Sequence, residues 1–176
     1  IELSFQSIGH YLGSFFNPLL EETREQLCSS MVIQYKAPYA EVIGLEKKPV
    51  VKKLYRLEIN SWKSRFGHHG EPYKASPDDV LVLADYKPKN VEDMQRVGRM
   101  CNLVSVVSTK KEIEGRIISV YIEVKASKDI DLTELRHNTL FLVSLTDVSI
   151  NRRIWDAFHV PLNLKLVEQI LCTPDM

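Results

Sequence analysis

The 176-residue sequence contains few of the residues from which common metal and redox sites are built. Its three cysteines, Cys28, Cys101 and Cys172, lie far apart, and no Cys-x-x-Cys pair occurs. This spacing gives no support for a zinc site or for thioredoxin-like chemistry, and it predicts free thiols in a reducing compartment, the nucleus or the cytoplasm. The longest apolar runs have the length of a strand, so we expect no contact with the interior of a membrane.

The sequence also lacks the short motifs of the major catalytic classes. Its seven glycines do not form a phosphate-binding loop, and neither a Gly-x-Ser-x-Gly elbow nor a His-Glu-x-x-His pair occurs. His68 and His69 are neighbours in an extended, glycine-flanked segment, where adjacent side chains point to opposite sides, and Asp78 and Asp79 fit a turn. We therefore expect a domain that is not an enzyme, with no catalytic residue, no metal and no cofactor.

Charge is distributed unevenly along the chain. Residues 31–128 contain 18 Lys or Arg and 12 Asp or Glu, a net charge of +6. Residues 1–30 contain 1 basic and 4 acidic residues, and residues 129–176 contain 4 and 7, so each end has a net charge of −3. The formal net charge of zero therefore conceals a basic middle between acidic ends, a pattern that favours a binding surface over a catalytic pocket.

The hydrophobic pattern changes at the same places as the charge. Apolar residues recur at spacings of three and four near both ends, and this periodicity predicts helices. Asn17 is expected to cap the second N-terminal helix, with Pro18 as its first residue, and Pro161 is expected to separate the two C-terminal helices. The predicted helices cover residues 4–15, 18–30, about 150–160 and 162–171.

The middle of the chain shows the pattern of short strands, with no long helix between them. Six to seven strands of this kind favour an antiparallel barrel over a parallel α/β sheet. We predict a single mainly β domain over residues 1–176, a small antiparallel β-barrel (32–147) on a helical stalk formed by the N-terminal (1–31) and C-terminal (148–176) helices. The predicted strands are 39–45, 53–59, 80–85, 97–107, 117–125 and 140–146.

Basic and aromatic residues alternate in the predicted barrel, and this combination has two interpretations. Small barrels that bind single strands use cations for phosphates and rings for base stacking, for which Tyr55, Trp62, Phe66, Tyr73 and Tyr86 are candidates. Alternatively, the lysines are a solvated surface and the rings form the core. The candidate phosphate-binding residues are Lys63, Arg65, Arg96, Arg99, Lys125 and Lys128.

Two further cations, Arg152 and Arg153, lie at the start of a predicted C-terminal helix. Positive charge at that end opposes the helix dipole, so another interaction is needed to explain it. We expect either an ion pair with the acidic helix around residues 21–25 or contact with a phosphate, and both arginines are therefore added to the candidate nucleic-acid-binding residues.

Several segments of the chain resemble the region that precedes the motor in plant senataxin-like helicases, which are Upf-type helicases of superfamily one. The first reads Phe-Gln-Ser-Ile-Gly-His-Tyr-Leu-Gly-Ser-Phe, and the others follow in order over nearly the whole chain. The matching segments are residues 5–15, 18–24, 37–42, 77–85, 124–128, 151–155 and 166–173.

The resemblance implies a β-barrel on a helical stalk, appended to the first RecA-like motor domain and lying over the nucleic-acid channel. The ATP-binding loop and the helicase motifs of the family would lie beyond Met176, so this chain is expected neither to hydrolyse ATP nor to unwind a duplex by itself. No catalytic residue of the family can be carried over. Because the chain begins at Ile1 rather than Met, we also expect it to be a piece of a longer protein.

These observations predict an accessory domain of a senataxin-like RNA/DNA helicase that binds single-stranded RNA or DNA through its backbone and regulates the motor. The alternative is a protein-interaction domain that docks a partner or the neighbouring motor through the apolar face of the stalk. The preference for RNA or DNA is left open.

Overall fold

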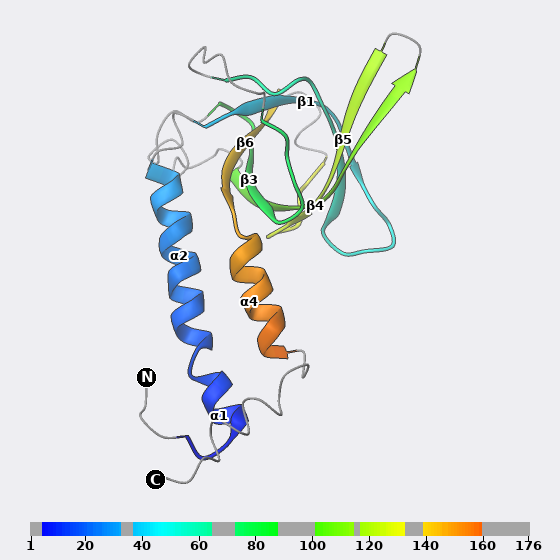
Figure 1. Ribbon diagram of the computed structural model, residues 1–176. Helices are drawn as coiled ribbons and strands as arrows, with labels where there is room; N and C mark the ends of the chain where they lie inside the picture. The colour runs from blue at the N-terminus through cyan, green and yellow to red at the C-terminus, as the bar shows by residue number, and fades with distance from the viewer. Residues whose placement is uncertain are drawn as a thin grey trace. The chain divides into compact units, whose positions relative to one another are not determined.

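The computed structural model of the chain describes residues 5–32, 37–64, 73–87, 101–114, 117–132 and 139–159 (Figure 1). The chain divides into two compact units. The helical unit comprises Ile1–Gln26 and Val148–Met176, and the barrel unit comprises Leu27–Asp147.

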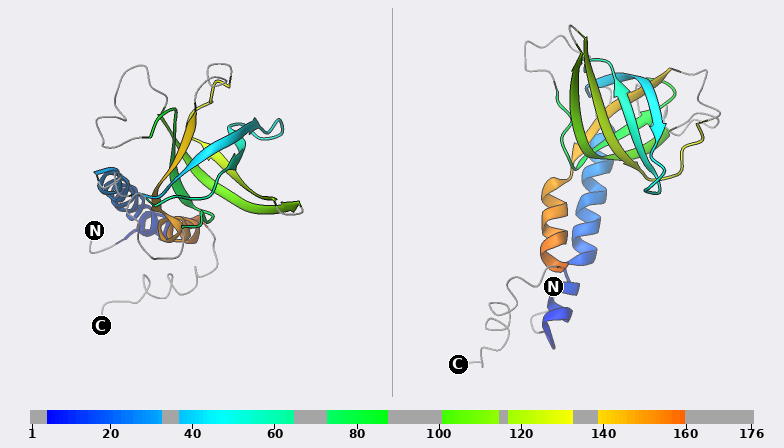
Figure 2. Two further views of the ribbon diagram at one scale, coloured as in Figure 1. Left: turned by 90° about the horizontal axis from the view of Figure 1, so that it is seen from above. Right: turned by 90° about the vertical axis from the view of Figure 1, so that its right-hand side faces the viewer.

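The barrel unit contains a closed antiparallel β-barrel in the strand order β1-β2-β5-β4-β3-β6, with β6 pairing back to β1 (Figure 2). The fold class expected from the sequence, mainly β with flanking helices, is therefore confirmed. Residues 97–100 of the predicted fourth strand lie outside the described residues. The strands are β1 (Tyr39–Lys47), β2 (Leu54–Ile59), β3 (Asp79–Ala84), β4 (Cys101–Glu114), β5 (Ile117–Ala126) and β6 (Leu140–Asp147).

The alternation of side chains along the strands builds the core. On β2, Tyr55, Leu57 and Ile59 point into the barrel and are buried, while Arg56 and Glu58 are only partly buried, in alternation with them. Strand β3 is buried almost throughout because its two faces pack against separate clusters of apolar residues. This explains why its sequence reads as a continuous apolar run rather than an alternating one.

Strands β4 and β5 form a hairpin longer than the rest of the barrel. Strand β4 pairs with β3 only from Cys101 to Ser105, and β5 pairs with β2 only from Val120 to Lys125. The two strands continue to pair with each other as far as Glu114 and Ile117, so the hairpin extends past its neighbours (Figure 1).

The helical unit contains α1 (Ile8–Gly13), most of α2 (Phe16–Val32) and α4 (Ser149–His159). The predicted start of the second helix at Pro18 was wrong. The amide of Leu19 donates to the carbonyl of Phe15 at 3.0 Å, so the helix begins at Phe16. Pro18 lies within the first turn, where its missing N–H would have no partner inside the helix in any case.

The N-terminal and C-terminal helices pack against each other in antiparallel orientation. The ring of Phe16 contacts those of Trp155 and Phe158 at centroid distances of 5.4 and 5.7 Å, and the amide of Asn151 donates to the Thr23 hydroxyl at 2.8 Å. The sequence predicted this pairing of apolar faces. The predicted helix over 162–171 lies outside the described residues. None of the described helices is long and apolar enough to cross a membrane.

Candidate nucleic-acid interface

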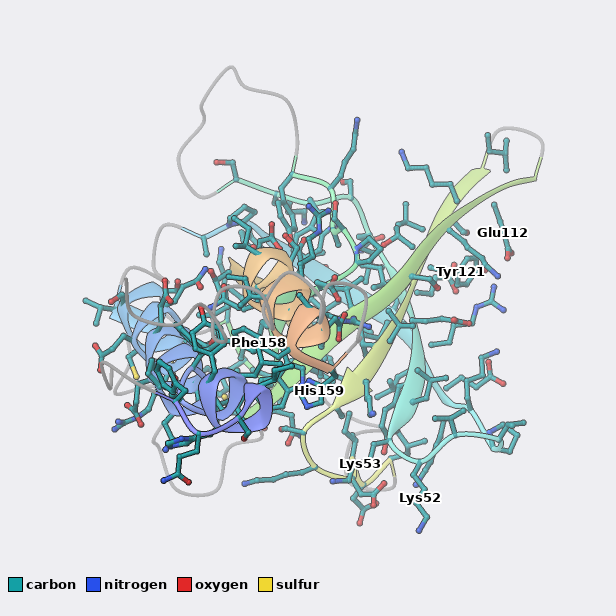
Figure 3. All side chains as sticks on the ribbon, turned by 60° about the horizontal axis from the view of Figure 1, so that its bottom comes forward. Lys52, Lys53, Glu112, Tyr121, Phe158 and His159 are labelled. Atoms are coloured by element: carbon teal, nitrogen blue, oxygen red, sulfur yellow. The ribbon has the colours of Figure 1, made fainter. Side chains whose placement is uncertain are left out.

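Six lysines lie at one end of the barrel, which we call the lysine end. Four belong to the segment that leads from the last residue of β1 to β2, whose sequence is Lys-Lys-Pro-Val-Val-Lys-Lys, and two lie at or just after the end of β5. Figure 3 labels Lys52 and Lys53 of this set. The two segments are neighbours because Leu54 pairs with Lys125 and the amide of Ala126 donates to the carbonyl of Lys53 at 2.9 Å. The lysine end consists of Lys47, Lys48, Lys52, Lys53, Lys125 and Lys128.

Hydrogen bonds hold the β1–β2 turn in one conformation. The amide of Lys48 donates to the carbonyl of Leu54 at 2.9 Å, and the amide of Leu54 donates to the carbonyl of Val51 at 3.4 Å. Lys53 has φ of 62°, in the left-handed region that residues with a Cβ rarely adopt. Its ammonium donates to the carbonyl of Ser127 at 2.9 Å, which ties the strained residue to the segment that follows β5.

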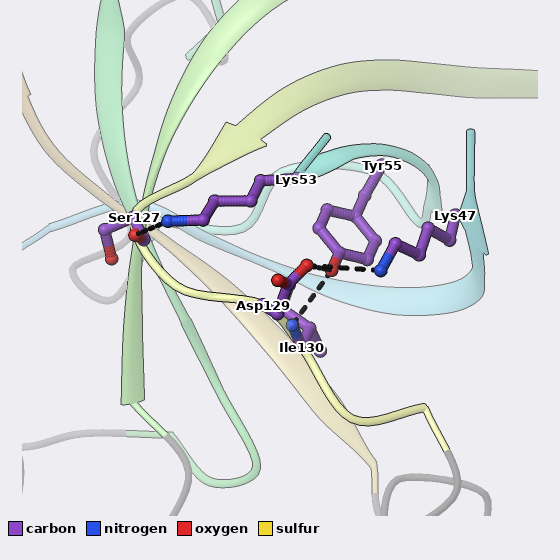
Figure 4. Close-up of polar contacts among 6 residues, drawn as sticks. All are labelled: Lys47, Lys53, Tyr55, Ser127, Asp129 and Ile130. Atoms are coloured by element: carbon purple, nitrogen blue, oxygen red, sulfur yellow. Dashed lines mark hydrogen bonds and ion pairs between the residues drawn. The ribbon is translucent and has the colours of Figure 1, made fainter. Parts of the chain in front are cut away.

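A buried tyrosine anchors that segment from inside the barrel (Figure 4). The ring of Tyr55 is completely buried, and its hydroxyl accepts a hydrogen bond from the amide of Ile130 at 2.9 Å and donates to Asp129 Oδ1 at 3.4 Å. Lys47 Nζ lies 3.1 Å from the same carboxylate oxygen. This hydrogen bond and the accompanying charge lower the pKa of Asp129 and raise the pKa of Lys47, so the pair is ionised at neutral pH.

The charge at this end of the barrel is positive. Residues 46–53 and 125–131 contain six lysines and three acidic residues, a net charge of +3. Lys47 is engaged with Asp129, whereas Lys52, Lys125 and Lys128 are exposed. Exposed ammonium groups held on a defined backbone suit the binding of phosphate oxygens along a nucleic-acid strand.

The structure brings together only part of the predicted phosphate-binding set. Lys125 and Lys128 lie at the lysine end. Lys63 does not, because it bridges to Tyr39, the first residue of β1, whereas Lys47 is the last. These ends of β1 are about 26 Å apart, at roughly 3.3 Å per residue. Arg65, Arg96 and Arg99 lie outside the described residues.

The four lysines of residues 47–53 were not among the phosphate-binding candidates chosen from the sequence. Their signal was present as two lysine pairs that flank Pro49, Val50 and Val51, but the first pair was interpreted as part of a turn and Lys53 as the first residue of a strand. Nothing local in the sequence indicates that this turn lies beside the end of β5, more than seventy residues later.

Arg152 and Arg153 belong to the helical unit, where both are exposed on α4. Arg152 Nε lies 3.8 Å from Asp156 Oδ2, one turn further along the same helix, and Glu21 pairs with Arg24 at 3.0 Å. The ion pair expected between these arginines and the helix around 21–25 stays a prediction.

The aromatic rings proposed for base stacking belong largely to the core. Tyr55 and Tyr86 are buried, and Trp62 packs edge-to-face on Tyr73 at a centroid distance of 4.6 Å, both against the core. The Tyr73 hydroxyl donates to Asp79, and burial raises its pKa far above the ordinary range. The alternative interpretation, in which the rings form the core, is thus correct for these four residues, and Phe66 lies outside the described residues.

Within the described ranges, no group of three or more His, Cys, Asp or Glu is placed to hold a metal ion. A shallow hollow of about 400 Å³ is lined in part by Arg56, Glu58, Glu112 and Tyr121. At its wall, Arg56 stacks over the Tyr121 ring at 4.0 Å and pairs with Glu112 at 2.8 Å, which leaves this surface mixed in charge.

Comparison with known proteins places the chain in a family without assigning an activity to it. Residues 1–176 match the family model described as Domain of unknown function (DUF6469). No curated protein matches the chain. Because the family model covers the whole sequence, the chain belongs to the DUF6469 family.

Proposed function

We propose that this domain is a non-catalytic accessory domain of a senataxin-like RNA/DNA helicase, which binds single-stranded nucleic acid through its backbone and regulates the adjacent motor. The connection to such a helicase rests on the resemblance of the sequence segments given above. Free cysteines and a nucleic-acid ligand both fit the nucleus or the cytoplasm.

The lysine end is the observation that carries the binding proposal. Lys52, Lys125 and Lys128 come from segments distant in sequence, and strand pairing brings them to one end of the barrel. Positive charge collected in this way supplies the sequence-independent part of nucleic-acid affinity. Because the rings of the barrel described above are committed to its core, phosphate contacts should dominate and the preference for particular sequences should be weak.

The binding proposal is tested by fluorescence anisotropy with labelled single-stranded RNA and DNA over a range of salt concentrations. The double variant Lys125→Gln/Lys128→Gln should weaken binding, and it should lower the slope of log affinity against log salt by about 1.4, at roughly 0.7 per phosphate contact on a single strand.

A matched control is Lys110→Gln/Lys111→Gln, which removes the same charge from exposed positions toward the far end of the β4–β5 hairpin. Equal losses of affinity in the two double variants would show that binding depends only on net charge, and the lysine end would then be excluded as a specific binding site. Absence of binding by the unmodified domain at low salt would contradict the proposal as a whole.

A second candidate function, docking of a partner protein or of the motor, is favoured by the helical unit. An apolar groove lined in part by Leu19, Leu20, Thr23 and Trp155 lies between α2 and α4, and Leu20 and Ile150 are largely exposed. Sedimentation velocity of the domain, alone and mixed with the motor, tests this function. Association of the domain with itself or with the motor that persists at high salt and is lost in Leu20→Ser/Ile150→Ser would support this function. A domain that stays monomeric and does not bind the motor would contradict it.

A further inference from the structure

The tip of the β1–β2 turn is apolar, although the surface around it is charged. Val50 is 91% exposed and Val51 is 46% exposed, and exposed Pro49 precedes them. Two lysines lie on each side of these three residues in the sequence. Val50 contributes little to the stability of the fold, because its side chain remains in water.

We infer that Pro49, Val50 and Val51 form a base-contacting tip, which makes the lysine end select single-stranded nucleic acid over duplex. This inference rests on the proposed function, since it assumes that the neighbouring lysines hold the phosphates. It adds the residues that determine which form of nucleic acid is bound.

The ligand must offer one kind of group to the lysines and another to the valines. A single strand presents phosphates for the lysines and unstacked base faces for the valines. In a duplex the base faces are stacked inside, so an apolar tip gains nothing from them unless it forces the base pairs apart, which costs free energy. The lysines should therefore contribute to both forms, and the valines to the single strand alone.

The conformation of the tip supports this role. The hydrogen bonds from Lys48 to Leu54 and from Leu54 to Val51 close the turn. Hydrogen bonds with Ala126 and Ser127 also tie Lys53 to the end of β5 and the residue that follows it. The valines are therefore presented by a backbone that is already ordered, which reduces the entropy lost on binding.

A bilayer surface is the other ligand that combines anionic and apolar groups. Stable anchoring there requires a larger apolar area than two valine side chains supply, typically a whole helix face or a lipid chain. The small apolar tip with six lysines around it fits a nucleic-acid strand better, and binding to anionic vesicles distinguishes the two ligands.

The test compares Val50→Ser with the unmodified domain on labelled oligo-uridine and on an RNA duplex of the same length. Val50→Ser should weaken single-strand binding about threefold to tenfold, the factor expected when roughly half of a valine side chain is covered. Its affinity for the duplex should not change. Val50→Trp should strengthen single-strand binding, because an indole stacks on bases.

The matched control is Ile113→Ser, an exposed apolar residue (70%) near the far end of the β4–β5 hairpin, which should change neither affinity. If Val50→Ser lowered the affinity for single-stranded RNA and for the duplex equally, the inference would be overturned. An unchanged single-strand affinity together with lost binding to vesicles containing phosphatidylserine would also overturn it.

The proposed function and the tip can fail separately in this design. If Lys125→Gln/Lys128→Gln weakens binding while Val50→Ser does not, the lysine end binds nucleic acid and the base-contacting tip is refuted. If the unmodified domain binds neither RNA, both proposals are refuted. Because Val50 is almost fully exposed, its substitution leaves the fold intact, and an unchanged circular dichroism spectrum verifies this.

Discussion

Removal of a single oxygen atom from the barrel interior, by Tyr55→Phe, tests how the lysine end is held in place. The ring of Tyr55 is completely buried and would still fill its space as phenylalanine. The change removes the hydroxyl that accepts a hydrogen bond from the amide of Ile130, and Ile130 is itself buried. It also removes a long hydrogen bond of 3.4 Å to Asp129, whose side chain is mostly exposed.

The cost comes mainly from the amide left without an acceptor. A buried donor that loses its partner costs about 1–3 kcal/mol of the free energy of unfolding, whereas the weak bond to an exposed carboxylate adds little. We therefore expect a loss of about 2 kcal/mol. With a urea dependence of roughly 2 kcal/mol per molar, the unfolding midpoint should fall by about 1 M.

Urea denaturation followed by circular dichroism measures this change, with Tyr121→Phe as the control. Tyr121 lies on the outer face of β5 beneath Arg56, and removal of its hydroxyl should cost less than about 0.5 kcal/mol. Hydrogen exchange should also accelerate at the amide of Ile130 in Tyr55→Phe. Equal stability of the two variants, with unchanged exchange at Ile130, would refute the role assigned to the Tyr55 hydroxyl.

Two further predictions concern ionisable groups. Burial raises the pKa of the Cys101 thiol, whereas Cys28 is exposed. In a Cys172→Ser background, iodoacetamide at neutral pH should therefore modify Cys28 before Cys101. Equal rates of modification at the two cysteines, measured by mass spectrometry, would contradict this. The hydrogen bond and charge of Lys47 lower the pKa of Asp129 below its ordinary value of 3.8. The ion pair therefore stabilises the fold at pH values above 3.8, and this stabilisation is lost as the pH falls through the pKa of Asp129 in the folded state. An NMR titration should show a higher Asp129 pKa in Lys47→Gln, and an unchanged value would show that the ion pair does not form in solution.

Much of the secondary structure could be read from local patterns. The alternation of Leu54 to Ile59 and the apolar run around Leu81 identify strands because side-chain direction in a strand depends only on neighbouring residues. The start of α2 was predicted two residues late, because Asn17 and Pro18 are residue types that favour the first positions of a helix. The hydrogen bond from the Leu19 amide to the Phe15 carbonyl shows that the helix begins before them. The base-stacking interpretation of Tyr55 and Tyr86 was wrong because composition does not reveal which face of a strand turns inward.

The sequence by itself determined the classes of element, their order, the basic middle and the apolar faces of the terminal helices, all of which depend on residues close together in the chain. Only the tertiary structure decided which lysines lie close together. Leu54 pairs with Lys125 because the closed barrel places β2 beside β5, and this pairing joins the β1–β2 turn to Lys128 while it leaves Lys63 at the other end of β1. Strand order and register arise from burying one common core, a free-energy balance among residues distant in sequence that no local pattern contains.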